Sequence, residues 1–204
     1  MHGHSLAGAC IALALSAGCS FGAAADPVTD QIDAARRAYQ TGDSNVAVEA
    51  LNIAIAQIRQ QQTEKQLKLF PEPLPGWSAN EASAQSSGFA AALTGKMLSR
   101  TYSNDETGAE VVMTISANSP FLGFISGIMQ MPLFMQGGEG LGAYVHKVYR
   151  GLLEPQQDGS AKLSLIIGSS VLLQLEGTRG ADAETLEAYL EAVDLGALES
   201  GFSG

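Results

Sequence analysis

Cysteine, histidine and positive charge are scarce in this chain. Both cysteines, Cys10 and Cys19, lie near the N-terminus, and His146 is the only histidine after His4. The part of the chain beyond residue 25 therefore lacks a thiol for a disulfide, for thiol catalysis or for a Cys–His zinc site. One histidine without a nucleophilic partner does not make a catalytic pair, so the sequence predicts neither an enzyme nor a cofactor.

Lysine and arginine together number 11, against 21 aspartates and glutamates, and the formal net charge is −10. No stretch gathers basic residues into a patch that could meet phosphates. The sequence thus predicts no nucleic-acid partner and no attachment to an anionic lipid surface. With 46% hydrophobic and 16% charged residues, the composition is that of a folded globular protein.

The N-terminus carries an apolar run, residues 6–17, followed by Cys19 and by alanines at 23–25. The run is too short to span a bilayer, and small residues of the A-x-A type follow it. It therefore predicts a Sec-type signal peptide over residues 1–25 and soluble export. Lipoprotein processing at Cys19, which would leave a lipid-anchored protein, is the alternative. In neither case do we expect a membrane-spanning segment.

Two helices are expected over residues 26–69. Asp26-Pro27 is a helix-start pair, Gly42 ends the first helix, and Asp43 or Ser44 caps the second. The short turn makes the two helices antiparallel. One side of the second helix is expected to carry its packing residues, namely Ala47, Ala50, Leu51, Ala54 and Ile58.

A further set of residues resembles one tetratricopeptide-type helical hairpin: Ala35, Tyr39, Gly42-Asp43, Ala47, Leu51 and Ala54. A single unit of that kind cannot bury its own apolar face. The resemblance implies that the hairpin docks on the rest of the chain, on a second copy or on another protein. Tyr39, Asp43 and Leu51 are the candidate partner-binding residues, and a hairpin that only packs is the alternative.

The proline-rich stretch FPEPLPGW begins at Phe70 and predicts a stiff, extended linker over residues 70–78. Trp77, the only tryptophan, is expected to anchor this linker on the domain that follows. Ser78, with Glu81 three residues later, has the spacing of a capping box and predicts the start of a helix. The second domain is expected over residues 79–204.

From residue 97 onward, apolar residues recur at every second position. This period predicts five strands, at residues 97–102, 110–116, 144–153, 162–167 and 171–175. Short turns join most of them, so the sheet should be antiparallel. A last helix, capped by Asp182, carries an apolar stripe of Leu186, Tyr189, Leu190 and Val193. The predicted fold class is α+β, an N-terminal antiparallel helical hairpin followed by a roughly five-stranded antiparallel sheet with helices packed on it.

The most apolar stretch beyond the signal segment is SANSPFLGFISGIMQMPLFMQGGEGLG, residues 116–142. Ser119-Pro120 predicts a helix start, and a helix over residues 119–135 would be apolar on most of its faces. Such a helix is either buried or shelters a lipid or another apolar small molecule. The candidate residues for that ligand are Phe121, Phe124, Ile128, Met131 and Phe134.

Three methionines of the same stretch offer soft thioether ligands for Cu(I), and they are Met129, Met131 and Met135. Methionine also fills irregular apolar gaps, and neither histidine nor cysteine joins the three. No usual metal site is predicted. His146 is expected to have a structural role, at the surface or half-buried.

Several features occur together in this chain: the signal segment, YQTGD from Tyr39, LPGW from Leu74, Ser119-Pro120 and the Met-rich helix. In this combination the chain resembles a group of uncharacterised exported bacterial proteins. The resemblance implies the periplasm and brings no activity and no site residues. We therefore expect a non-catalytic binding or assembly protein with a protein partner. A carrier of a lipid or other apolar ligand is the alternative.

Overall fold

Residues 26–85, 96–117, 122–123, 127 and 142–202 are described by the computed structural model. They divide into two units, one ending at Gln57 and the other beginning at Ile58. Helices and an antiparallel sheet are both present, which confirms the predicted α+β class. Within the described ranges, no helix combines the length and the apolarity needed to cross a bilayer.

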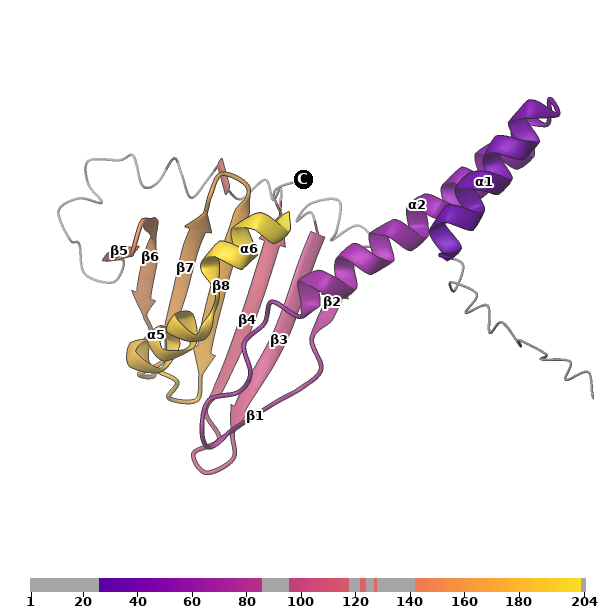
Figure 1. Ribbon diagram of the computed structural model, residues 1–204. Helices are drawn as coiled ribbons and strands as arrows, with labels where there is room; N and C mark the ends of the chain where they lie inside the picture. Colours follow the sequence, from indigo (N-terminus) through magenta and orange to yellow (C-terminus); the bar gives the residue numbers. More distant parts are fainter. Residues whose placement is uncertain (1–25, 86–95, 118–121, 124–126, 128–141, 203–204) are drawn as a thin grey trace, which may run out of the picture. The chain divides into compact units, whose positions relative to one another are not determined.

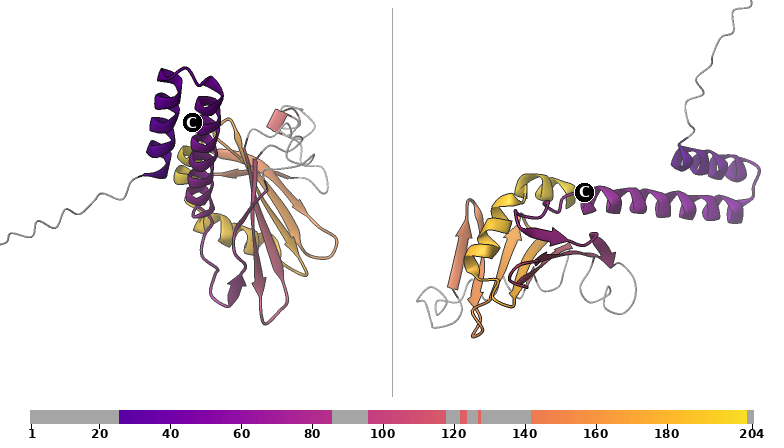
Figure 2. Two further views of the ribbon diagram at one scale, coloured as in Figure 1. Left: turned by 90° about the vertical axis from the view of Figure 1, so that its right-hand side faces the viewer. Right: turned by 90° about the horizontal axis from the view of Figure 1, so that it is seen from below.

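The first unit contains α1, Pro27–Gln40, and the beginning of α2, Ser44–Leu67. The Asp26 carboxylate accepts a hydrogen bond from the backbone N–H of Val28 and so caps α1. Gly42 turns the chain between the helices with a φ of 84°, a conformation that costs glycine little. The two helices run antiparallel and lie side by side (Figures 1 and 2).

Small side chains form the seam between these two helices. Ala35 of α1 and Ala47, Ala50 and Ala54 of α2 are each between 2% and 6% exposed. Alanine lets two backbones approach closely but gives the seam little apolar area to bury. Leu51, predicted to share the packing side of α2, is instead 45% exposed. Apart from Val28, which is 8% exposed, most of the larger apolar residues of the hairpin thus stay outside its seam.

The second unit is built on an eight-stranded antiparallel sheet in the order β1-β3-β4-β8-β7-β6-β5, with β2 also paired to β3 (Figure 1). The predicted number of five strands is therefore wrong. The strands are β1 (Trp77–Ala79), β2 (Ser83–Gln85), β3 (Lys96–Asn104), β4 (Glu110–Ala117), β5 (Gly142–His146), β6 (Tyr149–Pro155), β7 (Ala161–Ile167) and β8 (Val171–Thr178).

The additional strands have two causes. The predicted strand 144–153 is divided into β5 and β6 because Lys147 adopts a φ of 56° and, with Val148, turns the chain. β1 and β2 replace the helix predicted from Ser78, since both pair with β3. The capping-box spacing of Ser78 and Glu81 is a local preference, and strand pairing overrides it.

One face of the sheet carries the hydrophobic core. The helices α5, Ala183–Ala192, and α6, Leu195–Phe202, lie against this face (Figure 1). Leu186, Tyr189 and Leu190 of α5 are fully buried, which confirms the predicted apolar stripe. The strand residues that meet the helices alternate along β4, β7 and β8, and they are Val111, Met113, Ile115, Leu163, Leu165, Ile167, Val171, Leu173 and Leu175.

The segment predicted as a linker, residues 70–78, packs against the sheet. Phe70 is 4% exposed and belongs to the core. The ring of Trp77 stands edge-on to the ring of Tyr189, with 5.4 Å between the centroids. The anchoring role predicted for Trp77 is thereby confirmed. The second unit begins earlier, at Ile58 within α2, whereas the sequence places the domain boundary in this segment.

Candidate functional site

Large apolar side chains that remain exposed are concentrated in the helical hairpin. A scattered exposed apolar residue is ordinary in a folded protein, whereas a cluster marks a surface used for binding. Seven of the ten such residues in the described part of the chain belong to the first unit: Ile32, Tyr39, Val46, Val48, Leu51, Ile53 and Ile55.

Helical geometry places five of these residues on the same side of the hairpin. Successive residues are about 100° apart, so Val48, Leu51 and Ile55 lie within about 60° of one another around α2. Ile32 and Tyr39 lie within about 20° of one another around α1 by the same count. Because the helices are antiparallel, both groups flank the alanine seam on one side. These five residues form the hairpin patch, and they are between 45% and 73% exposed.

The two other exposed residues, Val46 and Ile53, lie about half a turn away around α2. They are 49% and 41% exposed, respectively. Their exposure resembles that of the hairpin patch, but no large apolar residue of α1 joins them among those exposed. They therefore provide matched positions for comparison with the patch.

Charged residues border the hairpin patch on α1. Arg36 Nη2 lies 3.1 Å from Asp33 Oδ1, and the two side chains are 67% and 40% exposed. On α2, Glu49 is the only charged residue between Ser44 and Gln57. An apolar centre with a charged rim is the usual composition of a protein interface.

The predicted partner-binding residues divide between two roles. Tyr39 and Leu51 belong to the hairpin patch. Asp43 instead caps α2: its carboxylate accepts from the N–H of Val46 at 3.4 Å, and its carbonyl accepts from the N–H of Ala47 at 3.1 Å. Sequence reasoning did not name three patch residues as partner-binding: the second apolar stripe of α2 was the signal for two of them, and the spacing of seven residues from Tyr39 on α1 was the signal for the third. Those three are Ile32, Val48 and Ile55.

The other candidate residues lie outside the described residues. This applies to the apolar-ligand set, Phe121, Phe124, Ile128, Met131 and Phe134, and to the Cu(I) set, Met129, Met131 and Met135. It also applies to Cys19 and to the signal segment. Leu122, Gly123 and Gly127 are helical within the same stretch. The carrier and copper hypotheses stay predictions.

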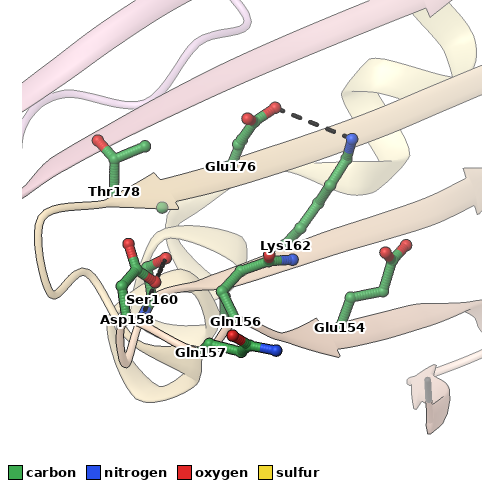
Figure 3. Close-up of a pocket in the computed structure, with 10 residues that line it drawn as sticks. Glu154, Gln156, Gln157, Asp158, Ser160, Lys162, Glu176 and Thr178 are labelled. Atoms are coloured by element: carbon green, nitrogen blue, oxygen red, sulfur yellow. Dashed lines mark hydrogen bonds and ion pairs between the residues drawn. The ribbon is translucent and has the colours of Figure 1, made fainter. Parts of the chain in front are cut away.

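A polar cleft of about 630 Å³ opens beside the turn between β6 and β7 (Figure 3). Lys162 Nζ lies 3.9 Å from Glu176 Oε2. The hydroxyl and the backbone N–H of Ser160 both donate to Asp158, and these bonds hold the pKa of that carboxyl below its ordinary value. The cleft thus offers polar surface whose charges are partly paired with one another, and the Ser160 hydroxyl is bound within its own turn.

His146 is 9% exposed, so the expected surface or half-buried position is corrected to a buried one. Its Nδ1 lies 3.7 Å from Glu191 Oε1, and Lys147 Nζ lies 3.5 Å from the other oxygen of the same carboxylate. These contacts fasten the turn between β5 and β6 to α5, which is a structural role. Across the described ranges, no three His, Cys, Asp or Glu side chains gather closely enough to hold a metal ion.

The chain was also compared with known proteins. No protein-family model matches it, and neither a curated protein nor a solved structure shows significant similarity to it. The hairpin patch is therefore identified as the candidate site from the geometry of this chain alone.

Proposed function

We propose that the protein is a non-catalytic binding or assembly protein of the periplasm, and that it docks a protein partner on the hairpin patch. The observation that carries this proposal is the concentration of exposed large apolar residues on one side of the hairpin. The alanine seam explains why these residues are not used for folding the hairpin itself. Export is supported by the signal segment at the N-terminus.

The apolar area that the hairpin patch can still bury is enough to anchor a partner. Burying an exposed Leu, Ile or Val side chain completely contributes roughly 1.5–3 kcal/mol. The patch residues are about half exposed, so each has roughly 1 kcal/mol left to gain and the five together roughly 5 kcal/mol. Association itself costs at least about 4 kcal/mol. A stable complex thus needs further contacts, which the charged residues on the rim of α1 can supply.

The experiment compares two matched positions on α2 with a photo-crosslinking amino acid. One is Val48 in the hairpin patch, and the other is Ile53 on the far side. In the periplasm of the expressing cell, we expect an adduct of higher mass from position 48 and little from position 53. Leu51→Glu in the same chain should abolish the adduct, because it places a carboxylate in the patch.

Two outcomes would contradict the proposal. In one, position 48 cross-links only to peptides from residues 58–202 of the same molecule, which would make the hairpin a packing element. In the other, position 48 gives no adduct more than position 53 does. Turnover of a substrate that depends on His146 would separately contradict the non-catalytic role.

A further inference from the structure

The stripe on α2 has the spacing of a coiled-coil seam. Val48, Leu51 and Ile55 follow one another at intervals of three and four residues, and Ile58, 38% exposed, comes three residues later. In a heptad written abcdefg, Val48 and Ile55 occupy the a positions and Leu51 occupies the first d position. This spacing is that of an apolar seam along which two helices can pack. Such a seam is self-complementary, because the same residues on a second helix fill the spaces between its side chains.

Charge is divided along α1 in a way that also suits a second copy. Asp30 and Asp33 lie in its first half, and Arg36 and Arg37 follow in its second half. Asp30 and Arg37 lie about 160° around α1 from Ile32 and Tyr39 and point away from the hairpin patch, whereas Asp33 and Arg36 lie beside it. When two α1 helices lie antiparallel, Asp33 of each lies toward Arg36 of the other. Parallel helices would instead oppose like charges. Asp33 and Arg36 are both exposed beside the hairpin patch, so they are in place for such contacts.

From these two observations we infer that the occupant of the hairpin patch is the hairpin patch of a second copy of this chain. A two-fold axis across the helices would set α1 and α2 antiparallel to their counterparts and would make a four-helix bundle from two hairpins. A closed two-fold contact of this kind buries both patches at once. This inference rests on the proposed function, since it names the partner.

Sedimentation velocity of the exported full-length protein, over a range of concentrations, tests the pairing. We expect a reversible dimer. Leu51→Glu should weaken it about 100-fold, a factor of ten for each of two symmetry-related carboxylates. Ile53→Glu is the matched control, because it adds the same charge to the same helix at a position of similar exposure, 41% against 45%. It should leave the dimer unchanged.

A mixing experiment tests the antiparallel arrangement. The variants Asp33→Arg and Arg36→Asp each break the ion pair within α1 and each leave α1 with one predominant sign of charge. Alone, each should dimerise more weakly than the wild type. Their equimolar mixture should form a heterodimer about fivefold tighter than either homodimer, because two exposed unlike pairs are regained across the contact. An effect confined to one molecule would not be rescued by mixing.

A wild-type protein that stays monomeric at the highest soluble concentration would overturn the inference. Equal dissociation by Leu51→Glu and Ile53→Glu would also overturn it, and so would a mixture no tighter than its components. The photo-crosslinking experiment separates these failures from failure of the proposed function. An adduct from position 48 with a different protein would leave that function standing, whereas a monomer without any adduct would remove both.

Discussion

The backbone carbonyl of Pro71 accepts hydrogen bonds from two side chains of β3, and this arrangement predicts strongly non-additive mutations. The buried Tyr102 Oη donates to it at 2.9 Å, and Arg100 Nη1 donates to it at the same distance. Pro71 itself is buried. These two bonds hold the segment 70–78 against the edge of the sheet.

One carbonyl oxygen can accept two hydrogen bonds. The expected changes in the free energy of unfolding of the single and double variants follow from this. Tyr102→Phe should cost about 1 kcal/mol and Arg100→Met about 2 kcal/mol, because in each variant the other donor remains. The double variant leaves a buried carbonyl without either donor, which adds a desolvation penalty of roughly 1–3 kcal/mol. The double variant should thus lose more stability than the sum of the single variants by about that amount.

Urea unfolding followed by tryptophan fluorescence measures these effects. Trp77 is the only tryptophan, and its contact with Tyr189 makes its emission sensitive to detachment of the segment. Arg150→Met, on the exposed part of β6, serves as the control partner for Tyr102→Phe and should give additive effects. Additivity within about 0.5 kcal/mol for Tyr102→Phe with Arg100→Met would refute the shared-carbonyl reasoning.

Two further predictions concern ionisation and close packing in the second unit. Burial raises the pKa of Tyr189 to about 12, and it raises the pKa of Tyr102 still further. Unfolded tyrosine loses its proton near a pKa of about 10, so the contribution of these two tyrosines to stability should be constant below about pH 10 and should fall as the pH rises from there toward about 12. Urea titrations at a series of pH values measure this fall, and a flat profile would contradict it. For packing, a Cβ on Gly177 would lie 2.2 Å from the backbone oxygen of Ala181. Gly177→Ala should therefore cost about 1–3 kcal/mol, whereas Gly142→Ala, whose Cβ would meet its nearest atom at 3.7 Å, is the control and should change little. Similar unfolding midpoints for the two variants would show that the close approach carries no energetic cost.

The parts of the fold that could be predicted are those in which one face of a strand or helix is buried. Val111, Met113 and Ile115 of β4 lie at every second position because the side chains of a strand alternate between the two faces of the sheet, and these three enter the core. The turn at Lys147 could not be predicted, since lysine rarely adopts a positive φ and no glycine marks the position. β1 and β2 have three residues each, too few for a period to be recognised.

The candidate site could be predicted only in part from the sequence. The hairpin pattern singled out Tyr39 and Leu51, because such hairpins leave an apolar side open. Both side chains are exposed in the hairpin patch, and their contact with a partner stays a prediction. The pattern grouped Leu51 with Ala47 and Ala54 on a single packing side, however. Whether the alanines or the larger residues line the seam depends on how closely the neighbouring helix approaches, and that distance is a property of both helices together.

The alanine seam has a consequence for how this sequence can change over evolutionary time. Folding of the hairpin depends on small residues such as Ala50 and Ala54, where any added methyl group would push the helices apart. Recognition, in the proposed function, depends on Leu51 and its neighbours, which bear on folding much less. On that proposal, two selective pressures act on neighbouring residues of a single helix, and the preference for one partner can change to another while the scaffold stays intact.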